Sequence, residues 1–191
     1  VGAGLADAQD QPKRGGQLTY VIFPEPPVLT SAVNTAGPTS QVSPKVFDGL
    51  VTYDFDFNLK PQLAESWQVT GDARSIRFNL RRGVKWHDGK DFTSADVAYS
   101  VMKVWKVAHG RGRATFANVT DVETPDAQTA ILRLSAPAPY IMYALASMES
   151  QIVAKHVYDG TDPLTNPANA APIGTGPFKF VEWRKGSHIN L

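Results

Sequence analysis

The sequence predicts a mixed fold of helices and antiparallel hairpins, of the α/β or α+β class. Apolar residues alternate with polar ones in several short runs bounded by turn residues, which is typical of antiparallel strands. Between these runs, apolar residues recur at the spacing of an amphipathic helix. Hydrophobic residues make up 42% of the 191 residues, which is enough for a folded core.

The first part of the chain predicts one strand and one helix. Residues 18–23 are rich in β-branched and aromatic side chains, which favours a strand. Prolines break this strand, and the small and polar residues 31–40 predict a loop. A helix is expected over residues 41–48, with Gly49 as its C-terminal stop. Three apolar residues should form its inward face: Val42, Val46 and Phe47.

Residues 63–80 predict two half-buried strands, after a short strand at residues 50–53. The two strands reverse at Thr70-Gly71-Asp72, because Gly71 supplies the positive φ that a tight turn needs. A second turn is expected at His87-Asp88-Gly89, since Asp-Gly pairs favour tight turns. The apolar residues that alternate along the two strands are Trp67, Val69, Ile76, Phe78 and Leu80.

A capped helix is expected next. Thr93 or Ser94 can cap its N-terminus, and Asp96 falls in its first turn, where the helix dipole favours a carboxylate. This helix should pack against the antiparallel strands. The apolar residues of its buried face are Val97, Val101, Val104, Trp105 and Ala108.

The rest of the chain predicts two more hairpins joined by short elements. Residues 109–113 are expected to be a flexible break, and residues 152–158 fit either a helix or a strand. The other expected elements are strands at 119–123 and 129–134 with a turn at 124–126, a helix from Pro139 to residue 146, a loop at 159–172, and a hairpin of residues 178–183 with 189–191.

Two separated motifs carry a family resemblance. The first comprises residues 63–67 (LAESW), 78–89 (FNLRRGVKWHDG) and 94–97 (SADV), and the second comprises residues 172–180 (PIGTGPFKF) and 183–186 (WRKG). In this order they resemble the family of extracytoplasmic solute-binding proteins that serve oligopeptide, dipeptide and nickel ABC importers.

This resemblance implies the N-terminal part of a two-lobed periplasmic-binding-protein-like fold, similar to type II cluster C, with an α/β core and an inserted α+β subdomain. Residues 1–15 are then a leader remnant or flexible N-terminus, and residues 16–43 begin the lobe I core. Residues 44–170 form the inserted smaller subdomain, and residues 171–191 return to the core. Family members are much longer, and the last residues still alternate, so we expect the chain to stop before lobe II.

The sequence offers no pattern for catalysis, a metal or a cofactor. The histidines at positions 87, 109, 156 and 188 lack the spacing that places two ligands on one helical face. Gly174-Thr175-Gly176 is followed by Pro177 and an expected strand, which favours a turn over a phosphate-binding loop. The serines lack a G-x-S-x-G motif. We therefore expect a protein that is not an enzyme and that has no cofactor.

Composition and charge exclude several kinds of partner. There is no cysteine, and no stretch approaches the ~18 apolar residues of a membrane span. The net charge is +1, which predicts no nucleic acid and no anionic membrane as a partner. Residues 74–113 hold ten Lys and Arg against three Asp and Glu, but they lack a nucleic-acid motif and are interpreted as a solvated face. The tryptophans are interpreted as packing residues, with Trp183 left open.

The loop of residues 23–37 is the candidate binding segment. It leaves the end of the first expected strand, where open α/β sheets commonly place their ligands. Its carboxylate, amide, hydroxyl and backbone groups suit the α-amino group and main chain of a peptide. An ordinary solvent loop is the alternative. The candidate substrate-binding residues are Phe23, Pro24, Glu25, Asn34, Thr35 and Ala36.

The resemblance implies a non-catalytic receptor that captures a peptide or similar small solute in an interlobe cleft and delivers it to an ABC importer. Its partners are then the ligand and the importer's permease subunits, with membrane contact only through the permease or a lipid anchor. Members also carry nickel complexes, sugars and opines, and no residue pattern selects among these. The alternative is an extracytoplasmic enzyme, or a sensing or binding module, on the same scaffold.

The first residues predict export. Residues 1–9 are small and largely apolar and resemble the end of a secretory leader near its cleavage site. We therefore expect a periplasmic or cell-surface protein, exported by a cleaved leader.

Overall fold

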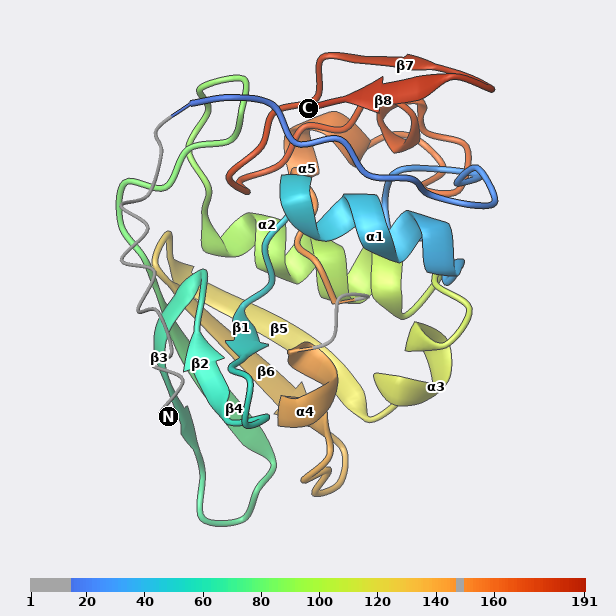
Figure 1. Cartoon of the computed structure of the whole chain (residues 1–191). Coiled ribbons are helices and arrows are strands. Elements are labelled where there is room, and N and C mark those ends of the chain that lie inside the picture. The colour runs from blue at the N-terminus through green and yellow to red at the C-terminus, as the bar shows by residue number, and fades with distance from the viewer. Residues whose placement is uncertain (1–14, 147–149) are drawn as a thin grey trace, which may run out of the picture.

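The computed structural model describes residues 15–146 and 150–191, and Figure 1 shows the arrangement of its elements. In chain order these are α1 (Gly37–Val46), β1 (Val51–Tyr53), β2 (Leu59–Pro61), β3 (Ala64–Val69), β4 (Ser75–Leu80), α2 (Ser94–Tyr99), the π-helical stretch η1 (Ser100–Trp105), α3 (Gly112–Thr115), β5 (Val119–Asp126), β6 (Thr129–Leu134), α4 (Ile141–Leu145), α5 (Lys155–Tyr158), the 3-10 helix η2 (Pro167–Asn169), β7 (Glu182–Arg184) and β8 (His188–Asn190).

Among the described residues, a four-stranded antiparallel sheet of order β3-β4-β6-β5 is the largest of three sheets, and β1-β2 and β7-β8 form the two smaller ones. β4 lies inside this sheet and buries Ile76, Phe78 and Leu80 in the core. Trp67 lies opposite Phe78 and is half-buried, whereas Val69 at the end of β3 is exposed. The predicted hairpin of residues 63–80 is therefore confirmed, with Val69 outside the core.

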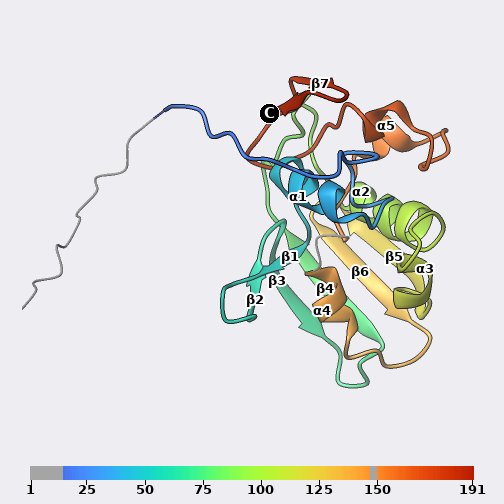
Figure 2. The ribbon, with the colours of Figure 1, turned by 45° about the vertical axis from the view of Figure 1, so that its right-hand side comes forward.

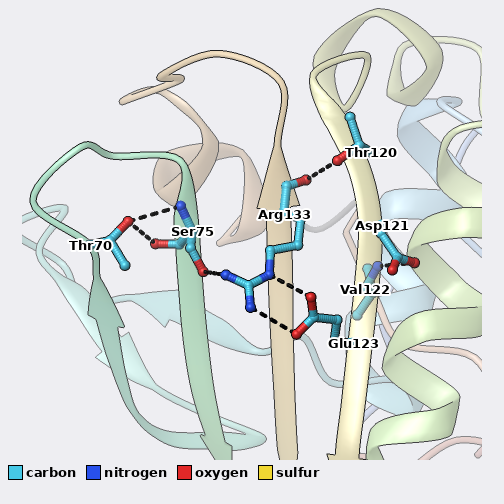
Figure 3. A network of polar contacts seen from close by, with 7 residues as sticks. All are labelled: Thr70, Ser75, Thr120, Asp121, Val122, Glu123 and Arg133. Carbon is cyan, nitrogen blue, oxygen red and sulfur yellow. Dashed lines mark hydrogen bonds and ion pairs between the residues drawn. The ribbon is translucent and has the colours of Figure 1, made fainter.

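The other face of this sheet is polar (Figure 3). The Arg133 guanidinium on β6 donates to both carboxylate oxygens of Glu123 on β5, at 2.7 and 2.8 Å. It also donates to Ser75 Oγ on β4 at 3.1 Å, and Thr120 Oγ1 donates to the Arg133 carbonyl at 3.1 Å. One polar network thus crosses three neighbouring strands, which gives the sheet one apolar and one solvated face.

α2 and η1 form one continuous helix that packs against β5 and β6 on the apolar face (Figures 1 and 2). Of the two predicted capping residues, Thr93 is the N-cap, and its backbone N–H donates to Asp96 Oδ2 at 2.9 Å. Lys106 N–H donates to the Val101 carbonyl, a π-helical bond that the sequence did not predict. The predicted buried face is confirmed: Val97, Val101, Val104 and Trp105 are buried and Ala108 is half-buried.

α1 begins and ends earlier than the predicted helix of residues 41–48. Pro38 stands in its first turn, a position that tolerates proline. Gly176 N–H donates to the Val46 carbonyl at 2.8 Å, and Phe178 N–H donates to the Lys45 carbonyl at 3.0 Å. Because a distant segment satisfies these carbonyls, the helix ends before Gly49, and the predicted stop is wrong. The predicted inward face of Val42, Val46 and Phe47 is buried as expected.

Residues 18–23 are not a strand, which corrects the first element of the sequence prediction. Leu18 and Val21 are 88% and 90% exposed. A strand requires a hydrogen-bonded neighbour, and no strand within residues 15–146 and 150–191 pairs with this segment. Its β propensity alone therefore does not decide its conformation.

Three expected turns differ in detail. In the β3–β4 turn, the positive φ belongs to Ala73 at 53° and not to Gly71. Residues 109–113 are a structured turn rather than a flexible break, because buried His109 accepts the Gly112 N–H at its Nδ1, at 2.8 Å, and α3 follows. The turn expected at residues 124–126 lies instead between Asp126 and Thr129, since Pro125 is accommodated at an irregularity of the edge strand β5.

The last part of the chain agrees with the prediction in outline. The ambiguous segment 152–158 contains both kinds of structure: an extended part, in which Ile152 N–H donates to the Asp48 carbonyl at 2.9 Å, followed by α5. The expected helix after Pro139 is α4, and the loop at 159–172 contains the short η2. The last predicted hairpin is present as β7 and β8, but residues 178–181, which were expected in its first strand, do not form a strand.

Candidate functional site

The middle of the candidate loop is buried and anchored, so that only its two ends reach the surface. Leu29 N–H donates to the Asn169 carbonyl at 2.7 Å, and Ser31 N–H donates to Ser43 Oγ at 2.8 Å. Residues 29–32 are fully buried. The six predicted binding residues therefore fall into two groups, one at residues 23–25 and the other at residues 34–36.

Glu25 carries the chemistry of the first group. Its Oε1 accepts hydrogen bonds from Trp183 Nε1 and from the Gly186 backbone N–H, each at 2.9 Å. Glu25 is thus not the isolated carboxylate that the sequence suggested. It joins the candidate loop to the turn between β7 and β8, and Trp183, whose role the sequence left open, is one of its two donors.

This arrangement keeps the Glu25 carboxylate ionised. The hydrogen bond from Gly186 lowers the pKa of Glu25 most, followed by the bond from Trp183 and the charge of Lys185. The Lys185 ammonium lies 5.0 Å from the centroid of the Trp183 ring, which is a cation–π distance. Phe23 and Pro24, beside Glu25, are exposed.

The second group forms a short turn before α1. Asn34 Oδ1 accepts the Ala36 N–H at 2.8 Å, an Asx turn, and the Asn34 amide NH₂ donates no hydrogen bond to a described residue. Thr35 is exposed, and its carbonyl accepts a hydrogen bond from Arg111 at 3.4 Å. No hydrogen bond within the described ranges joins this group to Glu25.

The turn of Gly174, Thr175 and Gly176 precedes the β7–β8 hairpin in the chain. It lies against the end of α1, the helix that follows the candidate loop. His87 Nε2 donates to the Gly176 carbonyl at 2.8 Å, and its Nδ1 accepts the Gly174 N–H at 3.3 Å. On the other side, both glycines lie against the backbone of Val46 at the end of α1. The sequence predicted a turn here, but not that His87 and α1 enclose it.

Two pockets lie outside the six predicted residues. One, of about 190 Å³, is lined by Trp105, His109 and Arg111, and Arg111 links it to Thr35. The other, of about 290 Å³, lies beside Lys90, Lys155 and His156. Within residues 15–146 and 150–191, no cluster of His, Cys, Asp and Glu could hold a metal ion. The same part of the chain contains no helix that is both long enough and apolar enough to cross a membrane.

Solved structures similar to this chain include proteins in complex with a small solute or a peptide. NikZ from Campylobacter jejuni, in complex with Ni(L-His), has a TM-score of 0.77 and 31% identity over 86% of this chain and 33% of its own. AgaA from A. tumefaciens R10, in complex with agropinic acid, has a TM-score of 0.72 and 36% identity over 86% and 33%. AppA from Bacillus subtilis, in complex with a nonapeptide, has a TM-score of 0.76 and 30% identity over 86% and 34%.

The fold is therefore part of that of the two-lobed periplasmic binding proteins of type II cluster C, as the resemblance implied. The sequence of oligopeptide-binding protein AppA is 29% identical over 187 residues, which are 95% of this chain and 34% of AppA. The chain spans about a third of the length of these relatives.

Residues 58–191 match the family described as bacterial extracellular solute-binding proteins, family 5 Middle. This chain belongs to that family.

Proposed function

We propose that the protein is the solute receptor of an ABC importer, which captures a peptide or similar small solute in a cleft between two lobes. The family match of residues 58–191 carries this proposal, because that family consists of solute-binding proteins. The nonapeptide, agropinic acid and Ni(L-His) bound by its relatives support a small polar ligand. The receptor closes on its solute, leaves it chemically unchanged and passes it to the permease subunits.

The exposed ends of the candidate loop form part of the cleft wall in this proposal. Their residues are Phe23, Pro24, Glu25, Asn34, Thr35 and Ala36. The ionised Glu25 suits a ligand amine or a basic group of lobe II, and the Asn34 amide suits a peptide main chain.

The same proposal divides the chain into a core and an insertion. Residues 16–43 and 171–191 belong to the lobe I core, and residues 44–170 form the inserted subdomain. The bonds of Glu25 to Trp183 and Gly186 support this division, because they join the two core pieces.

In this proposal the protein acts outside the cytoplasm. We infer that a cleaved leader exports it to the periplasm or cell surface, and that it meets the membrane only through the permease or a lipid anchor. The expected leader remnant, residues 1–9, lies outside the described residues. Membership of an extracellular family supports this localisation.

A thermal-shift assay of the full-length protein tests the function. Peptides, an opine and a nickel–histidine complex are added separately, and the unfolding midpoint should rise with the concentration of one ligand class. The ligand recovered after incubation should be unchanged. A midpoint that responds to none of these classes would contradict the proposal, and conversion of the ligand would favour the enzyme alternative.

A further inference from the structure

One face of the β7–β8 hairpin contacts the candidate loop through Trp183. Trp183 lies between Glu182 and Arg184 on β7, so its side chain is on the opposite face of the hairpin from theirs. On their face, Glu182 pairs with Arg184 at 3.1 Å and with His188 at 3.3 Å. On the other face, Trp183 Nε1 donates to Glu25 Oε1 at 2.9 Å. The contact of Trp183 with Glu25 is therefore separate from the ion pairs of the hairpin.

The two oxygens of the Glu25 carboxylate differ in their contacts. The hydrogen bonds from Trp183 Nε1 and from the Gly186 N–H both go to Oε1. Within residues 15–146 and 150–191, no hydrogen bond or ion pair goes to Oε2. Glu25 is exposed, so a solute can reach this oxygen. A carboxylate oxygen in this position suits a positively charged donor.

A cation of the chain already lies beside this carboxylate. The Lys185 ammonium is 5.0 Å from the centroid of the Trp183 ring, which is within the range of a cation–π contact. The Gly186 bond lowers the pKa of Glu25 most, and the charge of Lys185 lowers it further, although these two described side chains form no direct ion pair. An indole face next to a carboxylate thus attracts an ammonium, as these two kinds of group commonly do.

Lys185 is only loosely held in this position. It stands in a tight turn in which the Ser187 N–H donates to the Arg184 carbonyl at 2.9 Å. Its side chain is exposed, long and flexible. A cation–π contact at an exposed site stabilises little. A solute ammonium that reaches both the Trp183 ring and Glu25 Oε2 can therefore displace it.

We propose that Trp183 and Glu25 form an ammonium subsite of the solute cleft, and that Lys185 competes with the solute for it. In the proposed receptor, on which this inference rests, the group that enters the subsite is a primary ammonium. Lys185 then contributes to specificity, because a solute without a cation gains no attraction by displacing it.

The test uses n-butylammonium as the probe, since it carries the ammonium group whichever solute the receptor transports. It is titrated into the full-length protein and followed by the Trp183 Nε1–H signal in NMR spectra. Lys185→Met keeps a long side chain and removes its charge, so it should bind the probe about threefold more tightly than the wild type. Glu25→Gln should bind it about tenfold more weakly. Lys179→Met, which removes another exposed lysine charge, is the matched control and should bind like the wild type.

Two results would overturn the subsite. If Lys185→Met binds n-butylammonium like the wild type or more weakly, Lys185 is not a competitor. If n-pentanol, which has a similar shape and no charge, moves the Trp183 signal as much as n-butylammonium does, the contact is apolar and the subsite does not select an ammonium.

The subsite and the receptor function fail in different experiments. If a solute class raises the unfolding midpoint but n-butylammonium does not bind, the subsite is wrong and the receptor function stands. If n-butylammonium binds as expected but no solute class raises the midpoint, the receptor function fails and the ammonium site stands.

Discussion

The Glu25 carboxylate accepts hydrogen bonds from two residues that lie more than 150 positions further along the chain, separated from it by 158 and 161 residues. Sequence analysis selected Glu25 as a candidate but treated it as isolated, because no local pattern identifies donors at such separations. The cap of α2 is the opposite case. Thr93 and Asp96 are three residues apart and were predicted correctly, although the second bond of Asp96, from the Lys155 N–H 59 residues away, was not.

The pKa of Glu25 gives a residue-scale prediction. Because its folded-state pKa lies below the ordinary value of 4.5, the bonds to Glu25 stabilise the fold above that pH. This contribution should be lost as the pH falls through the lowered pKa. Trp183→Phe removes one donor and should move the pKa of Glu25 toward 4.5, as followed by NMR titration of the carboxyl group. An unchanged pKa in this variant would show that Trp183 does not hold the carboxylate.

At the scale of elements, the sequence predicted best those segments whose partners are near in the chain. The hairpin at residues 63–80 and the buried face of the following helix are both confirmed, because alternation and helical spacing are local signals. The prediction of a strand at residues 18–23 was wrong, because a strand needs a neighbouring strand, which the β propensity of a segment does not reveal. The end of α1 was misplaced because residues 176 and 178 determine it.

The α2–η1 helix supplies the first element-scale prediction. Val101 is fully buried against the sheet, so Val101→Asp places an unpaired carboxylate in the core. We expect the free energy of unfolding to fall by roughly 4 kcal/mol, measured by urea denaturation. Val107→Asp, at an exposed position in the turn that follows η1, is the control and should have little effect. Similar losses in both variants would contradict the observed helix face.

The second prediction at the scale of elements concerns the turn at Gly174. A Cβ at Gly174 would lie 1.8 Å from the Val46 carbonyl oxygen, which is part of the backbone and has little room to move. Gly174→Ala should therefore destabilise the protein by about 3 kcal/mol. A Cβ at Gly110 meets nothing within 4 Å, so Gly110→Ala should leave the thermal midpoint nearly unchanged. Equal midpoints for the two variants would mean that the turn does not lie against α1.

At the scale of the whole molecule, the two motifs were sufficient to predict the family and the fold class, which the comparisons confirm. The domain divisions at residues 43–44 and 170–171 and the six binding residues stay predictions. The chain spans about a third of the length of its relatives, and no residue pattern within it selects a ligand class, so ligand identity could not be predicted from it.

Exposed apolar side chains at both ends of the described chain lead to a prediction about residues 1–191 produced alone. These side chains are Leu18, Val21, Phe23, Phe178 and Val181. We expect residues 1–191 to bind a hydrophobic dye, because these side chains present apolar area to water. A sharp cooperative unfolding transition of these residues without dye binding would contradict this expectation.

The most direct test of the proposed solute site is the affinity of the full-length protein for its solute. This affinity is measured by titration calorimetry in two variants. Glu25→Ala removes the carboxylate of the proposed cleft wall and should weaken binding by about 10–100-fold, with the protein still folded but less stable because the bonds from Trp183 and Gly186 are lost. Asp126→Ala, in the turn between β5 and β6, should bind like the wild type. If Glu25→Ala also binds like the wild type, the loop of residues 23–37 is a connector, and the solute is held elsewhere.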